Sequence, residues 1–293
     1  MKIAIFGRNF NPDFKSYIVE FFQNIKRHKV ESVIYKPFLE FLKDDAGCDP
    51  MEEGYFTNVD NAPEDVDFMI SIGGDGTFLE SIMYLKDFNI PVIGLNSGRL
   101  GFLANISKEE ITEAVTSIIQ GDFELETRSL LTVETIANAF GHFNFALNDA
   151  TVQKYNSVMI NVNAYLDDEF LNTYWTDGLI ISTPTGSTAY SLSAGGPIVI
   201  PGSENFLIAP IASHNLTVRP IVIPDNIEIK LEVQSRSNKF LLTVDNRTSL
   251  MDLKDSSVII KKAKFELNMV KLPFNSYYST IRNKLMWGAD KRN

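Results

Sequence analysis

Hydrophobic and polar positions follow two different patterns along the chain, and the change between them divides it in two. In the first part, apolar runs of strand length are separated by segments whose apolar residues recur at helical spacing. Strands that alternate with helices in this way are typical of βαβ units around a mostly parallel sheet. Strands are expected at residues 2–6, 32–35, 66–72 and 91–95, and helices at 14–25, 38–43, 78–85 and 111–119.

Beyond Gly121, which is placed to end the last of these helices, the pattern predicts strands with few helices. It is clearest at 227–233, where apolar residues alternate with charged ones as in a half-exposed antiparallel strand. Further strands are expected at 124–136, 143–153, 158–166, 178–182, 239–244 and 257–263. We therefore predict an α/β domain over residues 1–125 and an all-β domain over 126–271, with the amphipathic tail 272–293 packed on the body of the protein.

Composition and charge narrow the classes of partner. The chain has 293 residues, 44% of them hydrophobic, and is long enough for two ordinary globular domains. A formal charge of −10 argues against nucleic acid or an anionic membrane as partner, since both attract basic surfaces. No signal peptide or membrane span is expected, and the single cysteine, Cys48, suits a cytoplasmic location. The histidines His28, His142 and His214 lack metal-ligand spacing, so no metal-binding residues are predicted.

The most informative segment is residues 70–77, Ile-Ser-Ile-Gly-Gly-Asp-Gly-Thr, at a predicted strand-to-helix turn. Glycines there let a ligand approach the backbone, and unpaired N–H groups at a helix start attract an anion such as phosphate. The carboxylate of Asp75 is anomalous in such a cradle because it repels phosphate. If Asp75 instead accepts a proton from a hydroxyl that attacks the phosphate, the combination predicts phosphoryl transfer.

This glycine-rich turn has three other interpretations. Asp75 could simply cap the following helix, as in any α/β protein. A dinucleotide fingerprint fits poorly because the G-x-G-x-x-G spacing is absent, and a Walker A loop would need a Gly-Lys-Ser/Thr sequence that the turn lacks.

A second group of candidate residues lies in the segment 176–197, which is rich in hydroxyl side chains and is interrupted by Pro184 and Gly186. Hydroxyls donate and accept hydrogen bonds, so the segment suits a hydroxyl-rich polar ligand, although a Ser/Thr-rich turn before a helix would look similar. The pair Asn148-Asp149 could hold ribose hydroxyls or form an ordinary turn. Residues 96–102 form another glycine-rich strand exit, where ligands bind in open α/β sheets.

Together these segments resemble the NAD kinase family, the ATP- or polyphosphate-dependent enzymes that phosphorylate the adenosine ribose 2′-hydroxyl of NAD. The Gly-Gly-Asp-Gly motif is shared with lipid kinases and phosphofructokinases, whereas the long 177–190 segment is typical of NAD kinases. The matching segments follow the family order over most of the chain and are 73–77, 96–103, 148–149, 177–190, 219–224 and 282–285.

The resemblance implies an α/β N-terminal domain with a mostly parallel sheet, a β-sandwich C-terminal domain, and a tail that returns to the first domain. It implies that Asp75 is the catalytic base, that ATP is the phosphoryl donor, and that Mg²⁺ or another divalent cation assists. The residues then expected to contact the dinucleotide or the phosphates are Gly74, Gly76, Thr77, Phe102, Asn148, Asp149, Asp177, Thr185, Thr188, Ala189, Tyr190, Ser191, Leu192, Ser193, Ala212 and Arg247.

Two departures from the family pattern are visible. Where many members have Asp-Gly-Gln after a late strand, this chain has Asp245-Asn-Arg247, so Arg247 could alter donor or product preference. Many members also carry Asn-Glu at the position of Asn148-Asp149, a shorter acid here that should still accept bonds from ribose hydroxyls.

Two alternatives to an NAD kinase fit the sequence less well. A lipid kinase of the diacylglycerol or sphingosine type shares the glycine-aspartate loop, but the hydroxyl-rich segment does not suit a lipid. A nucleotide-binding regulator without catalysis would not need Asp75. NAD and ATP are therefore the expected partners, in a homotetramer or homodimer, since the apolar stretch 195–211 exceeds what one small sandwich should bury.

Overall fold

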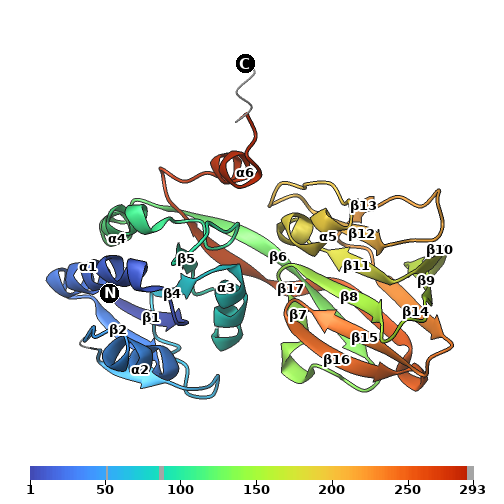
Figure 1. Ribbon diagram of the computed structural model, residues 1–293, viewed down its shortest axis with the longest axis horizontal. Coiled ribbons are helices and arrows are strands. Elements are labelled where there is room, and N and C mark those ends of the chain that lie inside the picture. The colour runs from blue at the N-terminus through green and yellow to red at the C-terminus, as the bar shows by residue number, and fades with distance from the viewer. Residues whose placement is uncertain (51, 86–88, 289–293) are drawn as a thin grey trace. The chain divides into compact units, whose positions relative to one another are not determined.

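The computed structural model describes residues 1–50, 52–85 and 89–288 and divides into two compact units. The first unit comprises Met1–Glu126 and Leu267–Asn293, and the second comprises Thr127–Glu266. Helices and strands alternate in the first unit, whereas strands dominate the second (Figure 1). Among the described residues, no helix combines the length and the apolar character that crossing a membrane requires.

The sheet of the first unit is parallel, with strand order β5-β4-β1-β2-β3. Its strands are β1 (Lys2–Gly7), β2 (Glu31–Tyr35), β3 (Gly54–Phe56), β4 (Phe68–Gly73) and β5 (Val92–Asn96). Its helices are α1 (Lys15–Arg27), α2 (Lys36–Asp44), α3 (Asp75–Ser81), α4 (Ile111–Gln120) and α6 (Tyr277–Leu285), with 3₁₀ turns at Pro12–Phe14, Ile82–Tyr84 and Lys108–Glu110. Because β4 and β5 run side by side in the same direction, the loops that follow them leave the same edge of the sheet.

Helix α1 shows why these segments form as the pattern predicts. Its buried residues Ile18, Phe21, Phe22 and Ile25 are spaced i, i+3, i+4 and i+7, which places them on one face of a helix. Helix α4 ends at Gly121, whose φ of 75° is the left-handed conformation that glycine adopts without steric cost. The predicted helix end is thus confirmed.

The second unit is a sandwich of two sheets around one apolar core. One sheet is antiparallel, in the order β13-β12-β11-β8-β15-β16, and consists of β8 (Asp149–Lys154), β11 (Gly178–Ser182), β12 (Asn205–Ile211), β13 (Ile221–Pro224), β15 (Lys239–Val244) and β16 (Arg247–Asp252). The other contains β6 (Glu124–Thr135), β7 (Phe145–Ala146), β9 (Ile160–Leu166), β10 (Glu169–Thr176), β14 (Ile229–Ser235) and β17 (Ser257–Lys271). Short helical segments lie at Gly141–Phe143, Thr185–Thr188, Tyr190–Ser193 (α5) and Leu253–Asp255. The expected fold class, α/β followed by a β-sandwich, is confirmed.

One expected strand was wrong in an informative way. Residues 143–153 do not form a single strand, because β7 pairs with β6 in one sheet while β8 pairs with β11 and β15 in the other. The chain therefore changes sheets at Leu147 and Asn148, and the strand-like patterns on both sides of this point conceal the change.

The stretch 195–211 also differs from its interpretation as surplus apolar surface. Leu207, Ile208 and Ala209 belong to β12 and are fully buried within this chain, because β12 lies between β11 and β13. Only the earlier part of the stretch remains accessible, with Ile200 48% exposed.

Candidate active site

The glycine-rich turn joins β4 to α3, as its sequence predicts. Strand β4 is buried throughout and ends at Gly73, and α3 begins at Asp75. The N-cap of α3 is the extended residue Gly74, and no side chain caps the helix. The interpretation of Asp75 as a helix cap is therefore wrong, and its carboxylate has a different task.

Three consecutive backbone N–H groups hold the Asp75 carboxylate. Phe102 N donates to Oδ2 at 2.9 Å, and Leu103 N and Ala104 N both donate to Oδ1 at 2.9 Å. An ionised carboxylate has about four acceptor sites. The geometry therefore leaves one site on Oδ2 for a further donor, and the partly exposed side chain can receive it without losing its anchor.

The glycines around Asp75 have distinct roles. A Cβ at Gly101 would lie 1.9 Å from Asp75 Oδ1, so only glycine lets the loop close on the carboxylate. Gly74 and Gly76 have nothing within 4 Å of a Cβ position, which leaves their backbone open to a ligand. Gly101 was not among the predicted site residues, although its place in Leu-Gly-Phe-Leu after a strand exit was the available signal.

The loop whose residues 102–104 bind Asp75 is itself held by hydrogen bonds from two other segments. The buried Asn96 side chain donates to Arg99 O at 2.8 Å and to Ala104 O at 3.1 Å. From the C-terminal tail, Asn275 Nδ2 donates to Asn105 O at 2.8 Å and Lys284 Nζ donates to Leu100 O. The segment 282–285, which matched the family without an assigned task, thus contacts the loop that orients Asp75.

In the second unit, the structure brings the pair Asn148-Asp149 against the hydroxyl-rich segment. Thr183 N donates to Asn148 O at 2.9 Å, and Ser182 Oγ donates to the same oxygen at 3.2 Å. A Cβ at Gly186 would lie 2.0 Å from Asn148 O, so the close approach requires glycine. The two sequence candidates therefore form one structural unit.

The remaining candidates of this segment lie on short helical turns. The Tyr190 side chain is 41% exposed, and its hydroxyl accepts a bond from Gln153 Nε2 at 3.2 Å, so its ring is not part of the core. Thr185 and Ser191 are buried, and Thr188 Oγ1 donates to Thr185 O at 3.3 Å. The turn and helix that carry Thr185, Thr188, Ala189, Tyr190, Ser191, Leu192 and Ser193 follow directly after β11.

Asp177 and Ala212 lie at the opposite end of β11. Asp177 precedes the strand and pairs with Lys154 Nζ at 2.8 Å, and its N–H donates to Ile211 O at 3.0 Å. Ala212 follows Ile211 with a φ of 47° and is exposed. Since a strand rises about 3.3 Å per residue, these two residues are separated from Ser182 by roughly the length of β11.

The Arg247 side chain points toward the backbone of residues 143–145. Its Nη1 donates to Phe143 O at 2.7 Å, Nη2 donates to Phe145 O, and the guanidinium lies 5.4 Å from the centre of the Phe145 ring. The side chain thus binds the backbone just before the change of sheets. Nothing in the sequence indicates this direction, because it depends on how the turn between β15 and β16 folds back.

Two buried carboxylates stand close together beside this turn. Burial and, after it, the Asp245 charge together raise the pKa of Asp149 to about 7, and the bond from Thr151 Oγ1 at 3.0 Å opposes the shift. Burial also raises the pKa of Asp245, although three backbone N–H groups and Arg247 oppose it. The Asp149 carboxyl therefore carries a proton part of the time near neutral pH.

Replacing Asp149 by asparagine should therefore stabilise the free protein at high pH relative to the parent. The folded parent holds a proton between about pH 4 and pH 7 that the unfolded chain has lost, so its stability falls as pH rises through that window. The variant lacks this loss, which is worth on the order of 1.4 kcal/mol per unit of pKa difference. Urea unfolding at pH 5 and pH 8 measures the free energy of unfolding of both proteins. A difference between variant and parent that is the same at the two pH values would contradict the prediction.

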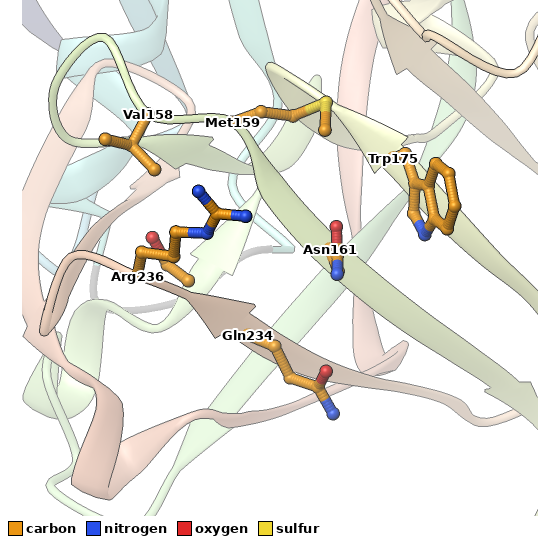
Figure 2. Close-up of a pocket in the computed structure, with 7 residues that line it drawn as sticks. Val158, Met159, Asn161, Trp175, Gln234 and Arg236 are labelled. Carbon is orange, nitrogen blue, oxygen red and sulfur yellow. The ribbon is translucent and has the colours of Figure 1, made fainter.

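A separate hollow of about 680 Å³ lies at one end of β9, β10 and β14 (Figure 2). Trp175, 52% exposed, stands at one side of it, and Arg236 lies on the opposite side. None of the predicted site residues lines it. Among the described residues, no three His, Cys, Asp or Glu side chains converge as metal ligands would.

Known proteins match the whole of the chain. The sequence model of the ATP-NAD kinase N-terminal domain matches residues 17–123, and that of the ATP-NAD kinase C-terminal domain matches 147–272. The NAD kinase of Cytophaga hutchinsonii is 41% identical over 296 residues, and that of Flavobacterium johnsoniae is 43% identical over 298, each alignment covering 100% of both chains. The NAD kinase of Porphyromonas gingivalis is 43% identical over 292 residues and 99% of both chains.

Solved structures agree with the sequence matches. A yeast NADH kinase complexed with NADH superposes with a TM-score of 0.82 at 24% identity, covering 100% of this chain and 89% of the other. An NAD kinase from Archaeoglobus fulgidus in complex with ATP gives a TM-score of 0.72 at 25% identity, covering 98% of each chain. The matched domains and relatives do not support the lipid kinase alternative.

Proposed function

The chain belongs to the NAD kinase family, and from that premise we propose which of its residues transfer a phosphoryl group from ATP to the ribose 2′-hydroxyl of NAD. The observation that carries the proposal is the Asp75 carboxylate, fixed by three backbone N–H groups beside two open glycines. A carboxylate held in this way at a phosphate cradle suits a general base.

Asp75 Oδ2 is the proposed base atom because it accepts one backbone N–H, whereas Oδ1 accepts two. The 2′-hydroxyl gives its proton to Oδ2 while its oxygen attacks the γ-phosphorus of ATP. The bond from that phosphorus to the bridging oxygen breaks, and ADP leaves. The bonds from the 102–104 loop keep the carboxylate in place throughout, so most of the rate comes from positioning.

We propose that a divalent cation enters this site with ATP, since the Asp75 carboxylate is already engaged by backbone donors. Mg²⁺ commonly keeps several waters and binds through substrate phosphates. We therefore treat Mg·ATP as the substrate. Assaying NADP formation with an NADP-specific dehydrogenase should show activity with Mg²⁺ and none with excess EDTA, and full activity in EDTA would contradict the proposal.

The second unit is proposed to hold NAD. Asn148 and Asp149 accept bonds from ribose hydroxyls, and the exposed Tyr190 ring stacks on a planar part of the dinucleotide. Asp177 binds near the nicotinamide end. The other residues proposed to contact substrates are Gly74, Gly76, Thr77, Phe102, Thr185, Thr188, Ala189, Ser191, Leu192, Ser193 and Ala212.

Replacing Tyr190 by alanine should raise the KM for NAD by about 5- to 30-fold with little change in kcat. The lost stacking removes binding that the ground and transition states share, worth about 1 to 2 kcal/mol. Steady-state kinetics on this variant measure the effect. Phe170→Ala, which removes another half-exposed ring of the same unit, is the control and should keep the parent KM. An unchanged KM in the Tyr190 variant would exclude the stacking role.

A homotetramer or homodimer formed through the β-rich unit is also proposed. The support within this chain is a set of exposed apolar side chains on loops and the edge strand of this unit, among them Ile200, Leu216 and Val222. Light scattering that shows a fully active monomer at micromolar concentration would exclude it.

A further inference from the structure

The change of sheets between β7 and β8 is fixed by one buried side chain. Leu147 N donates to Asp245 Oδ2 at 2.9 Å, and Asn148 N and Asp149 N donate to Oδ1 at 2.8 and 3.2 Å. Asp245 N in turn donates to Asp149 O at 2.9 Å. The Asp245 side chain is only 2% exposed, so its carboxylate is bound by these backbone N–H groups and not by water.

The turn that contains Asp245 also binds the backbone of residues 143–145, through the side chain of Arg247. Its guanidinium donates to the carbonyl oxygens of Phe143 and Phe145, and its Nε donates to Val244 O at 3.2 Å. The turn thus binds N–H groups after the change of sheets and carbonyl groups before it. Asp245 has a φ of 52°, a left-handed conformation in which aspartate is enriched among non-glycine residues.

The hydroxyl-rich segment contacts the change of sheets from the other side. Thr183 N and Ser182 Oγ both donate to Asn148 O, which also lies against Gly186. The backbone of Asn148 is therefore held by hydrogen bonds from two directions. A fixed backbone limits the directions in which the Asn148 and Asp149 side chains can point, because the allowed rotamers depend on the backbone conformation.

We propose that the turn Asp245–Arg247 is a positioning element for NAD binding. It presents Asn148 and Asp149 in the orientation that receives the ribose hydroxyls, and Arg247 acts through the backbone of residues 143–145 and not by contact with NAD. The inference rests on the proposed function, which assigns the ribose to Asn148 and Asp149. It assigns Arg247 the role of holding the backbone in place, whereas the family resemblance implies contact with a ligand.

Asp255 provides a matched control for Asp245. It lies in the same unit, is also buried, and accepts Ile136 N and Ala137 N at 2.9 Å each; neither of these described residues is a proposed site residue. In both positions, asparagine keeps one acceptor oxygen and turns an NH₂ group toward a backbone N–H. Both variants should therefore lose thermal stability, and only Asp245→Asn should weaken NAD binding.

The experiment is calorimetric titration of NAD, with KM and kcat, on the parent, Asp245→Asn and Asp255→Asn. We expect the NAD dissociation constant to rise at least about fivefold in Asp245→Asn, the effect of losing one hydrogen bond. The KM for ATP should stay at the parent value. An increase no larger than that of Asp255→Asn overturns the inference.

Arg247→Gln decides the matter if Asp245→Asn does not fold. The positioning role predicts a loss of NAD affinity, because the shorter amide cannot donate to both carbonyls, and partial rescue by Arg247→Lys. Parent affinity in Arg247→Gln overturns the inference. A folded parent chain that forms no NADP would instead show that the proposed function has failed.

Discussion

Replacing Asp75 by asparagine is expected to lower kcat by about 10²- to 10⁴-fold, the usual value of a general base. The amide cannot take the proton of the 2′-hydroxyl. The structure adds a second consequence, because the carboxylate accepts three backbone N–H groups and an amide NH₂ would face one of them. We therefore expect a loss of stability as well, on the order of 1 to 3 kcal/mol.

The two effects are separated by measuring kcat, the NAD dissociation constant and the melting temperature together. Asp255→Asn creates the same donor–donor conflict outside the proposed site and should keep the parent kcat. A kcat for Asp75→Asn within about threefold of the parent, far short of the general-base range, would exclude Asp75 as the base.

The second large effect is expected from Gly101→Ala. The new Cβ would lie 1.9 Å from Asp75 Oδ1, so either the carboxylate or the loop must move. A displacement of about 1 Å at a reacting group can cost on the order of 10²-fold in rate. We expect kcat to fall by about that factor, while the NAD dissociation constant is nearly kept because the proposed NAD residues lie mainly in the other unit.

Gly98→Ala is the control for this variant. It lies in the same loop, has nothing within 4 Å of its Cβ position, and does not have a positive φ. Equal kcat values for the Gly98 and Gly101 variants would show that the contact between the loop and Asp75 does not determine the rate.

The position of Asp75 could be predicted from sequence because a buried strand, a glycine turn and a helix are all local patterns. Its partners could not be predicted. They are backbone N–H groups of Phe102, Leu103 and Ala104, and every residue except proline carries such a group, so their sequence gives no signal. Only the parallel pairing of β4 with β5 brings the two loops together.

The second unit shows a different limit. The segment 143–153 looks like one strand, because the two sheets of a sandwich require similar residues on their inner faces. Asp245 makes the change of sheets possible by accepting N–H groups at the break, from almost 100 residues further along the chain. Long-range hydrogen bonds of the same kind join Arg247 to the carbonyl oxygens of Phe143 and Phe145, and no local pattern of the sequence predicts them.

The most direct test of the account is the formation of NADP by the purified chain. Incubation with NAD, ATP and Mg²⁺, followed by an NADP-specific dehydrogenase, detects the product, and ADP is measured in parallel. The account predicts NADP and ADP in equal amounts from the parent and from Gly98→Ala, and very little from Asp75→Asn. A folded parent chain that forms no NADP under these conditions, or that releases ADP without it, would contradict the account.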